Sequence, residues 1–99
     1  MLRHVVSWKL AAEDTATKQE QFATIAAALE SLPPLIPEIR SLTVGSNIAY
    51  PESNWDLVLI ADYDDADALE VYQTHPEHVK VTHIIRPLVA KRSAVDFLI

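Results

Sequence analysis

Polar and apolar residues alternate from residue 2 to residue 10, a period of two that is typical of a β-strand. The more apolar of the two strand faces consists of Leu2, His4, Val6, Trp8 and Leu10. One of its five residues is thus a histidine. A polar ring on an apolar face needs a hydrogen-bond partner or a cavity. We therefore expect His4 either to be paired inside the core or to line a pocket.

A helical period replaces this alternation from Asp14 to Leu32. The apolar positions that fall on one side of that helix are Phe22, Ile25, Ala26, Leu29 and Leu32. Thr17 and Glu20 have the spacing of a capping box at its start. Pro33 and Pro34 cannot continue a helix, so we expect it to end there.

Two further strands are expected in the middle of the chain. Residues 38 to 48 have the pattern of a strand that ends near Gly45, and residues 51 to 54 form a turn. Trp55 to Tyr63 is the next strand, and its centre, residues 57 to 61, is apolar on both faces. Such a strand is expected to be central in its sheet or covered on both sides.

The last third of the chain predicts two helices and a strand. An acidic run can cap the first of these helices and complement its dipole, and it comprises Asp62, Asp64, Asp65 and Asp67. Ala66, Leu69 and Tyr72 are its expected inward face, and it should stop at His75 because a proline follows. Residues 76 to 85 predict a short helix with an apolar side of Val81, Ile84 and Ile85. Pro87 closes it, and Leu88 to Leu98 is the last expected strand.

The order strand, helix, strand, strand, helix, strand is that of the split βαβ arrangement in ferredoxin-like folds. We therefore predict an α+β fold, one domain over residues 1–99, with a four-stranded antiparallel sheet and its helices on one face. The other sheet face would be bare. Because two such faces can bury each other, the pattern predicts a homodimer.

Composition narrows the class of partner. Apolar residues make up 49% of the 99 residues and charged residues 22%, and the net charge is −6. Such a balance is typical of an ordered globular chain and disfavours nucleic acid as a partner. The chain has no cysteine, no signal-peptide pattern and no apolar run long enough to span a membrane. We expect a cytoplasmic protein.

Tyr72 and His78 have the chemistry of an acid–base pair. A neutral imidazole can take a proton from a carbon beside a carbonyl, and a phenol can donate a hydrogen bond to the enolate oxygen that forms. The alternative is structural, with Tyr72 as an amphipathic helix residue and His78 as a local hydrogen-bonding group. His75 precedes a proline and is expected to stabilise the end of a helix.

A metal site is disfavoured. His75 and His78 could share one helical face, with His83 further on, but a third well-placed ligand is not evident. The acidic run lacks the glycine and terminal glutamate of a calcium loop. We expect no metal and no organic cofactor.

Several motifs together resemble one family, the stress-responsive dimeric α/β-barrel (Dabb) domain. They are Arg3-His4-Val5-Val6 with Lys9, Gly45, the run Tyr72-Gln73-Thr74-His75-Pro76-Glu77-His78-Val79, and Asp96-Phe97. The similarity covers nearly the whole chain. The resemblance implies a homodimer in which two sheets form a barrel.

The same family includes plant polyketide cyclases that close an aromatic ring by aldol chemistry. The resemblance implies that Tyr72 and His78 act on the substrate and that His4 lines the same pocket. This chain departs from the cyclases at Leu57, where they carry a further histidine, and on its first helix, where Ala and Ile replace aromatic residues. The cyclase reaction itself is therefore not expected to transfer.

Two functions remain open at this stage. One is an enzyme without cofactor that performs a cyclase, isomerase or lyase type of reaction on a small apolar carbonyl compound. Tyr72 and His78 would be catalytic, and the substrate would contact His4, Val6, Trp8, Leu59 and Leu69. The other is a non-catalytic stress-response dimer.

Overall fold

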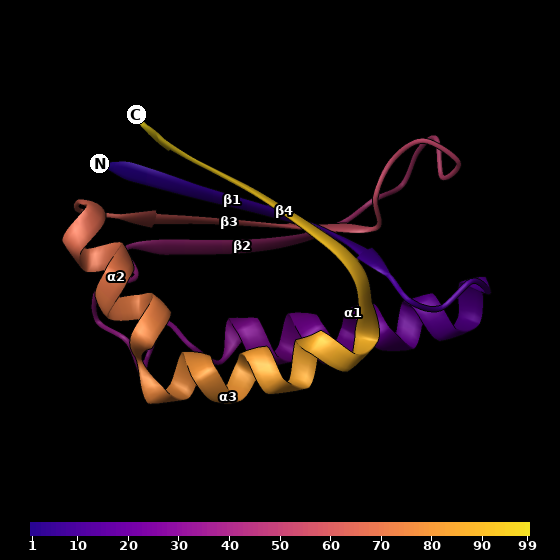
Figure 1. Ribbon diagram of the computed structural model, residues 1–99, viewed down its shortest axis with the longest axis horizontal. Coiled ribbons are helices and arrows are strands. Elements are labelled where there is room, and N and C mark those ends of the chain that lie inside the picture. Colours follow the sequence, from indigo (N-terminus) through magenta and orange to yellow (C-terminus); the bar gives the residue numbers. More distant parts are fainter.

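The computed structural model describes all residues, 1–99, as one sheet covered by helices on one side (Figure 1). The strands are β1 (Leu2–Leu10), β2 (Ser41–Ser46), β3 (Leu57–Tyr63) and β4 (Val89–Leu98). The helices are α1 (Thr15–Glu30), α2 (Ala66–Thr74) and α3 (Pro76–Ile85), and a short 3₁₀ turn, η1 (Arg86–Leu88), follows α3. The predicted α+β, ferredoxin-like fold is confirmed.

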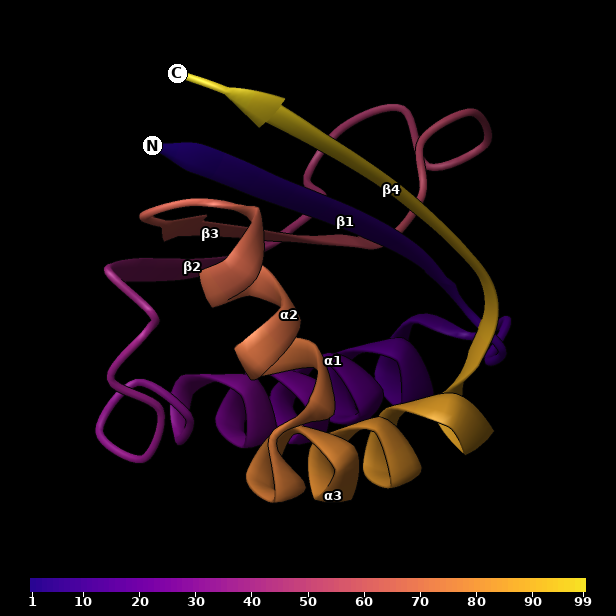
Figure 2. The same cartoon turned by 60° about the vertical axis from the view of Figure 1, so that its left-hand side comes forward.

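The four strands lie in the order β2-β3-β1-β4, and every neighbouring pair is antiparallel. β1 is central and pairs with β3 along one edge and with β4 along the other. Leu2 lies opposite Leu98, so the two chain ends are side by side (Figure 2). Position 4 of β1 is thereby held between Ala61 of β3 and Asp96 of β4.

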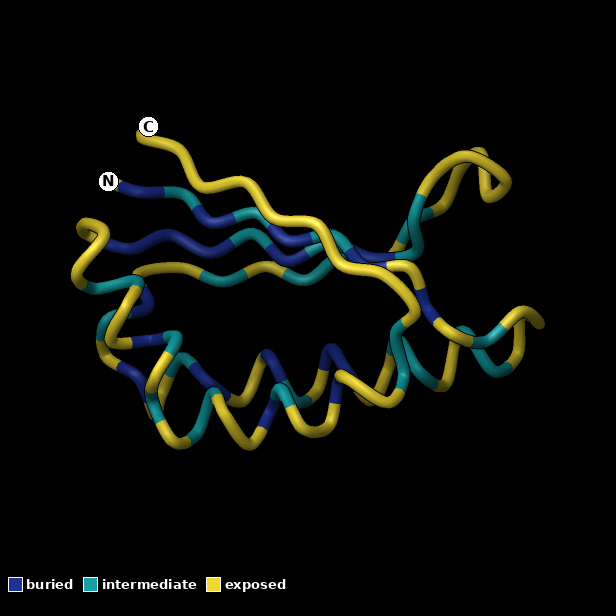
Figure 3. The backbone as a smooth tube through the Cα atoms, in the orientation of Figure 1, coloured by how far each residue is buried: buried dark blue, intermediate teal, exposed yellow.

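The core lies between the sheet and the helices, where Figure 3 shows the buried segments facing each other. The alternation in β1 is confirmed, because Leu2, His4, Val6, Trp8 and Leu10 are all buried. The predicted face of α1 is buried at Ile25, Ala26 and Leu29, while Phe22 is half-buried. The helix ends at Glu30 rather than at Leu32, and Leu32 is buried in the turn that follows. The apolar side chains of both layers therefore interlock as the two periods require.

The cap of α1 differs from the predicted capping box. Asp14 is the N-cap residue, and its carboxylate accepts hydrogen bonds from the Thr17 amide at 2.9 Å and the Thr17 hydroxyl at 2.8 Å. Aspartate is as good an N-cap as threonine, and its position one turn earlier leaves Thr17 inside the helix.

The aspartates predicted to cap α2 have different roles in the structure. Asp65 alone caps α2, by accepting from the Ala68 amide at 2.9 Å. Asp62 belongs to β3, where it is buried and accepts from the Arg3 guanidinium at 2.8 and 3.0 Å and from the Ser41 hydroxyl at 3.0 Å. This pairing lowers the pKa of Asp62. The carboxylate is an ion-pair partner across the sheet rather than a cap.

The other corrections concern boundaries and faces. β2 begins at Ser41 rather than at residue 38, because Ile36 and Ile39 turn into the core first. Ala66 and Ile84, predicted to face inward, are exposed. Ala66 is the first residue of α2, and Ile84 lies beside the buried Ile85, which takes the inward position at the end of α3.

The second face of the sheet carries no helix (Figures 1 and 2). β4 is an edge strand and is exposed from Ala90 onward. Val95 and Phe97 on this strand are 61% and 44% exposed, and the register places them on the same open face as Val5 of β1 and Ile60 of β3. We call this apolar group of four residues the open-face cluster. As a separate point, none of the three α-helices has the length and the apolar character that spanning a lipid bilayer requires.

Replacing Ile25 with alanine should lower the free energy of unfolding by about 2 to 5 kcal/mol, because Ile25 is fully buried between α1 and the sheet and its loss leaves a cavity. Ile84→Ala is the matched control, since Ile84 is 43% exposed and should cost about 1 kcal/mol or less. Urea unfolding at one fixed protein concentration measures both. Equal costs at the two positions would contradict the described packing of α1.

Candidate functional site

A cavity of about 580 Å³ lies between the sheet and the helices. β1, β3 and β4 form one wall, and α1, α2 and α3 with η1 form the other. Its lining residues are His4, Val6, Trp8, Leu29, Leu59, Tyr72, Gln73, His78, Thr82, Ile85, Arg86, Val89, Ala90, Lys91 and Arg92. The size is in the range of small-molecule sites, and the lining combines apolar walls with a few polar groups.

The break between α2 and α3 positions two of these residues. Pro76 is the first residue of α3, and His75 before it is extended, with φ −62° and ψ 135°. The His75 Nδ1 atom accepts a hydrogen bond from the Glu77 amide at 3.1 Å and so caps the start of α3, not the end of α2 as expected. Tyr72, in the last turn of α2, thus meets His78, in the first turns of α3, with ring centroids 4.2 Å apart.

His4 reaches the cavity from the centre of the sheet. Its ring is almost fully buried, and its Nδ1 atom makes a short hydrogen bond to the Asp96 carboxylate of β4. His4 and Asp96 lie directly opposite each other in the register of β1 and β4, so the hydrogen bond joins two adjacent strands. Because the carboxylate can only accept when ionised, it orients the ring with a proton on Nδ1.

Four aromatic rings gather around this point. His4 packs edge-on against both Tyr63 and Tyr72, with centroid distances of 6.4 and 6.3 Å. Tyr63 and Tyr72 are 5.1 Å apart. Tyr72, His4 and His78, which the sequence identified as candidates, therefore form one contiguous group with Tyr63. The three candidates come from three different elements.

The hydrogen bond of His78 defines its tautomer. Its Nδ1 atom lies 3.0 Å from the Gln73 carbonyl oxygen, which can only accept. The ring therefore carries its proton on Nδ1 and leaves the Nε2 lone pair as the base. Burial lowers the pKa of His78, and the hydrogen bond to the Gln73 carbonyl opposes this change. Positive charge on His4, Arg92 and His75, in decreasing order of effect, lowers the pKa further. The imidazole is consequently neutral at pH 7.

Tyr72 has the opposite character. Burial raises the pKa of Tyr72 to about 12, and the effects of Tyr63 and Arg92 oppose this rise. The phenol stays protonated at any physiological pH, and the Tyr63 hydroxyl beside it acts on Tyr72 as a donor rather than as an acceptor. The Tyr72 phenol is free to donate to a ligand. A neutral base and a neutral donor therefore lie beside each other at the cavity wall.

The structure brings together most of the residues predicted for the site. Tyr72, His78 and the strand residues His4, Val6, Trp8 and Leu59 line the cavity. Leu69 does not, because it lies one turn before Tyr72, where it is half-buried against the core.

Three relevant residues were not predicted from the sequence. Gln73 orients His78 through its backbone, Asp96 orients His4, and Arg92 places a positive charge near both Tyr72 and His78. The Asp96 contact could have been found by pairing the first and last strands in register. Arg92 could have been found in the same way, because it lies opposite Trp8 in that register, whereas the Gln73 contact depends on the turn between α2 and α3.

The histidines do not assemble a metal centre. His75 uses Nδ1 to cap α3, and no three His, Cys, Asp or Glu side chains lie close enough together to hold a metal ion.

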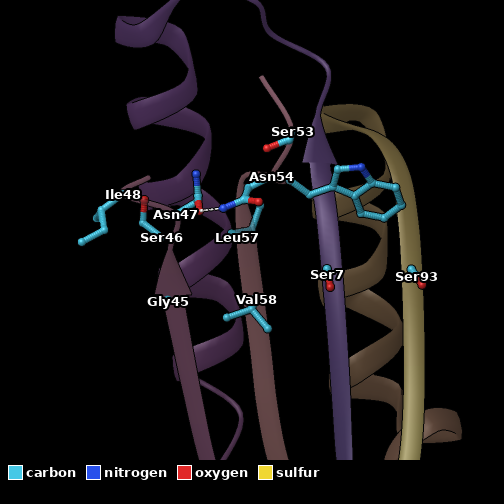
Figure 4. Close-up of a pocket in the computed structure, with 11 residues that line it drawn as sticks. Ser7, Gly45, Ser46, Asn47, Ile48, Ser53, Asn54, Leu57, Val58 and Ser93 are labelled. Atoms are coloured by element: carbon cyan, nitrogen blue, oxygen red, sulfur yellow. Dashed lines mark hydrogen bonds between the residues drawn. The ribbon is translucent and has the colours of Figure 1, made fainter. Parts of the chain in front are cut away.

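A second hollow, of about 670 Å³, lies on the open face of the sheet near the loop between β2 and β3 (Figure 4). Ser7, Val58 and Ser93 point toward the viewer from three strands, with the helices behind them. The Asn54 side-chain amide donates to Asn47 at 3.2 Å beside it. Its lining contains no titratable side chain. It offers surface for packing but no acid–base group.

Comparison with known proteins gives a family and a fold. The family model "Stress responsive A/B Barrel Domain" (Dabb) matches residues 2–99. A dimeric protein of unknown function with a ferredoxin-like fold from Bacteroides fragilis is 32% identical, with a TM-score of 0.86 over 97% of this chain and 93% of that chain. A dimeric ferredoxin-like protein of unknown function from Thermobifida fusca is 33% identical, with a TM-score of 0.81 over 99% and 90% of the two chains.

One solved structure of lower sequence identity is that of an enzyme. Hydroxynitrile lyase from Passiflora edulis has a TM-score of 0.82 over 99% of this chain and 92% of that chain, but only 15% identity. At that identity the likeness concerns the fold alone. Among curated proteins, no sequence matches this chain.

The geometry of His78 makes a spectroscopic prediction. At pH 7 its Nδ1 atom should carry the proton and Nε2 should be bare, and the pKa of the ring should lie below 6.5, because burial disfavours the charged form. Long-range ¹H–¹⁵N correlation spectra between pH 5 and 8 measure both quantities. A ring that carries its proton on Nε2, or one still charged at pH 7, would contradict this description.

Proposed function

The chain belongs to the stress-responsive A/B barrel domain (Dabb) family, and we propose that it is a homodimer whose subunits each bind a small, largely apolar carbonyl compound and act on it by acid–base chemistry. The observation that carries the proposal is the convergence of His4, Tyr72 and His78 on one cavity, with the base of His78 and the donor of Tyr72 beside each other. The dimer and the chemistry rest on separate arguments.

The open face of the sheet supports the dimer. An antiparallel sheet with one helical layer leaves its second face to water, and here that face holds the open-face cluster of Val5, Ile60, Val95 and Phe97. Stacking two such faces would bury the apolar groups of both copies. Both relatives above 30% identity are described as dimeric. The hollow beside Ser7 and Val58 lies on the same face and would be covered by the partner.

The proposed reaction begins with proton abstraction beside the carbonyl. The Nε2 atom of neutral His78 takes the proton from carbon, and the electron pair moves onto the carbonyl oxygen as the enolate forms. Tyr72 donates a hydrogen bond to that oxygen as its negative charge grows. His78 then returns the proton to carbon or to a leaving group. Cyclisation, isomerisation and cleavage by a lyase all use this step.

His4 has a positioning role in this proposal. The Asp96 carboxylate fixes the His4 ring, whose edge packs against Tyr72 and holds the phenol at the cavity wall. Apolar walls from Val6, Trp8 and Leu59 would take the non-reacting part of the ligand. The lyase of Passiflora edulis supports only the view that this fold can carry a lyase activity.

A non-catalytic stress-response dimer is the second candidate. It is favoured by the description of the family as stress-responsive and by the buried Leu57, which stands where the resemblance to plant cyclases implies a further histidine. In that case the cavity would bind a ligand without converting it.

Val95→Asp should dissociate the dimer, because it places a carboxylate in an apolar interface where the charge has no partner. Light scattering at micromolar concentration should give about twice the subunit mass of 11.0 kDa for the wild type and a single subunit mass for the variant. Val79→Asp is the control, since Val79 is 40% exposed on α3 and should leave the dimer intact. A wild type with a mass near 11.0 kDa would remove the dimer from the proposal.

Exchange of the carbon-bound hydrogens of 4-phenyl-2-butanone in D₂O measures the proposed proton abstraction directly. The wild type should accelerate exchange, His78→Gln should reduce the acceleration by about 10² to 10⁴-fold, and Tyr72→Phe by about 10² to 10³-fold. The rate should rise with pH through a midpoint below 6.5, because only the neutral base accepts a proton and burial lowers the pKa of His78. His83→Gln, at an exposed position, is the control. Binding without any acceleration of exchange would favour the non-catalytic candidate.

A further inference from the structure

The unpaired cations of the chain are concentrated at the cavity. Of the eight lysines and arginines, four are in ion pairs, namely Arg3, Lys18, Arg40 and Lys80. The other four are Lys9, Arg86, Lys91 and Arg92. Arg86 and Arg92 are cations of the cavity lining, whereas Lys91 lies opposite Lys9 in the register of β1 and β4, on the open face of the sheet. No aspartate or glutamate lines the cavity, although the chain as a whole has a net charge of −6. Two arginines therefore belong to the lining of a cavity in an acidic protein, and the Asp96 carboxylate that contacts His4 is a negative charge beside it.

Arg92 is the cation placed best to act on a ligand. It lies directly opposite Trp8 in the register of β1 and β4, on the sheet face that is turned toward the helices. His4 lies on the same face of β1, four residues before Trp8. The charge of Arg92 also lowers the pKa of both Tyr72 and His78, so the guanidinium is within electrostatic reach of the acid–base pair. Arg86, at the end of α3, has an additional favourable interaction with the helix dipole.

We propose that the ligand of this cavity carries a carboxylate, bound by Arg92 with Arg86 at the rim, while its carbonyl group lies at Tyr72 and His78. The inference rests on the proposed function and adds the substrate class to it: an oxo acid with an apolar body. A guanidinium binds a carboxylate through two parallel hydrogen bonds, and such charge-assisted bonds are the strong ones. The volume of about 580 Å³ accommodates a ring with both groups.

The same arrangement gives the carboxylate an effect on the chemistry. Unliganded Arg92 disfavours a proton on His78, because the two positive charges repel each other. A bound carboxylate neutralises the guanidinium and removes this repulsion. His78 then becomes a stronger base when an acidic ligand occupies the cavity, and a neutral ligand produces no such change.

The experiment compares 4-oxo-4-phenylbutanoate with its methyl ester, which keeps the ring and the ketone but has no charge. Dissociation constants are measured by calorimetry for the wild type, Arg92→Gln, Arg92→Lys and Lys9→Gln. Lys9→Gln removes the same charge from a cation that does not line the cavity. The melting temperature of each variant shows whether it is folded, and Arg92→Lys retains the charge if the glutamine variant is unstable.

The wild type should bind the acid about 10 to 100-fold more tightly than the ester. Arg92→Gln should reduce this preference to about twofold or less without weakening the ester, Arg92→Lys should keep part of it, and Lys9→Gln should keep all of it. Salt should weaken the acid alone. Equal binding of acid and ester by the wild type, or an equal loss of both in Arg92→Gln, overturns this inference alone. Failure of both compounds to bind the wild type overturns the proposed function with it.

Discussion

The interruption of the second half of the chain at Pro76 is the constraint on which the site depends. Proline has no amide hydrogen and disfavours helical backbone at the residue before it, so one continuous helix cannot form over residues 66–85. The chain forms α2 and α3 instead, and the extended His75 between them turns its imidazole into the cap of α3. That turn places Tyr72 and His78 against each other and leaves the Gln73 carbonyl free to orient His78.

The central strand provides the other half of the site. Because β1 pairs on both edges, a side chain on its helix-facing side cannot turn away to solvent, and His4 must satisfy its polar atoms where it is. Asp96 can do this only because β4 is an edge strand beyond the helical layer, where its carboxylate is 40% exposed and stays hydrated. The edge strand thus also supplies the hydrogen-bond partner of a buried histidine.

The parts of the fold that depend on periodicity were predictable from the sequence. The strand faces around Val6 and the helix face around Ile25 follow from local spacing. The prolines indicate where the helices end, since each helix stops two or three residues before one of them. The capping box at Thr17 was wrong because Asp14 offered an equally good cap one turn earlier. Asp62 was misassigned because an acidic run near a helix start favours capping, whereas its Arg3 partner lies 59 residues away. For the site, the motif identified the aromatic and histidine residues, but their orienting groups come from tertiary structure.

Tyr63 shows what it costs to keep a polar cluster inside so small a core. Its hydroxyl is fully buried and has no hydrogen-bond partner within the chain, and burial raises the pKa of Tyr63. An unsatisfied buried hydroxyl costs about 1 to 3 kcal/mol, a substantial part of the stability of a domain of this size. A phenylalanine would fill the same space against Tyr72 without that cost. The lower effective dielectric that makes the lone hydroxyl unfavourable also strengthens the hydrogen bond that Tyr72 can give to a developing negative charge. Burial thus disfavours the isolated Tyr63 hydroxyl and favours the hydrogen bond that Tyr72 can donate within the same cluster.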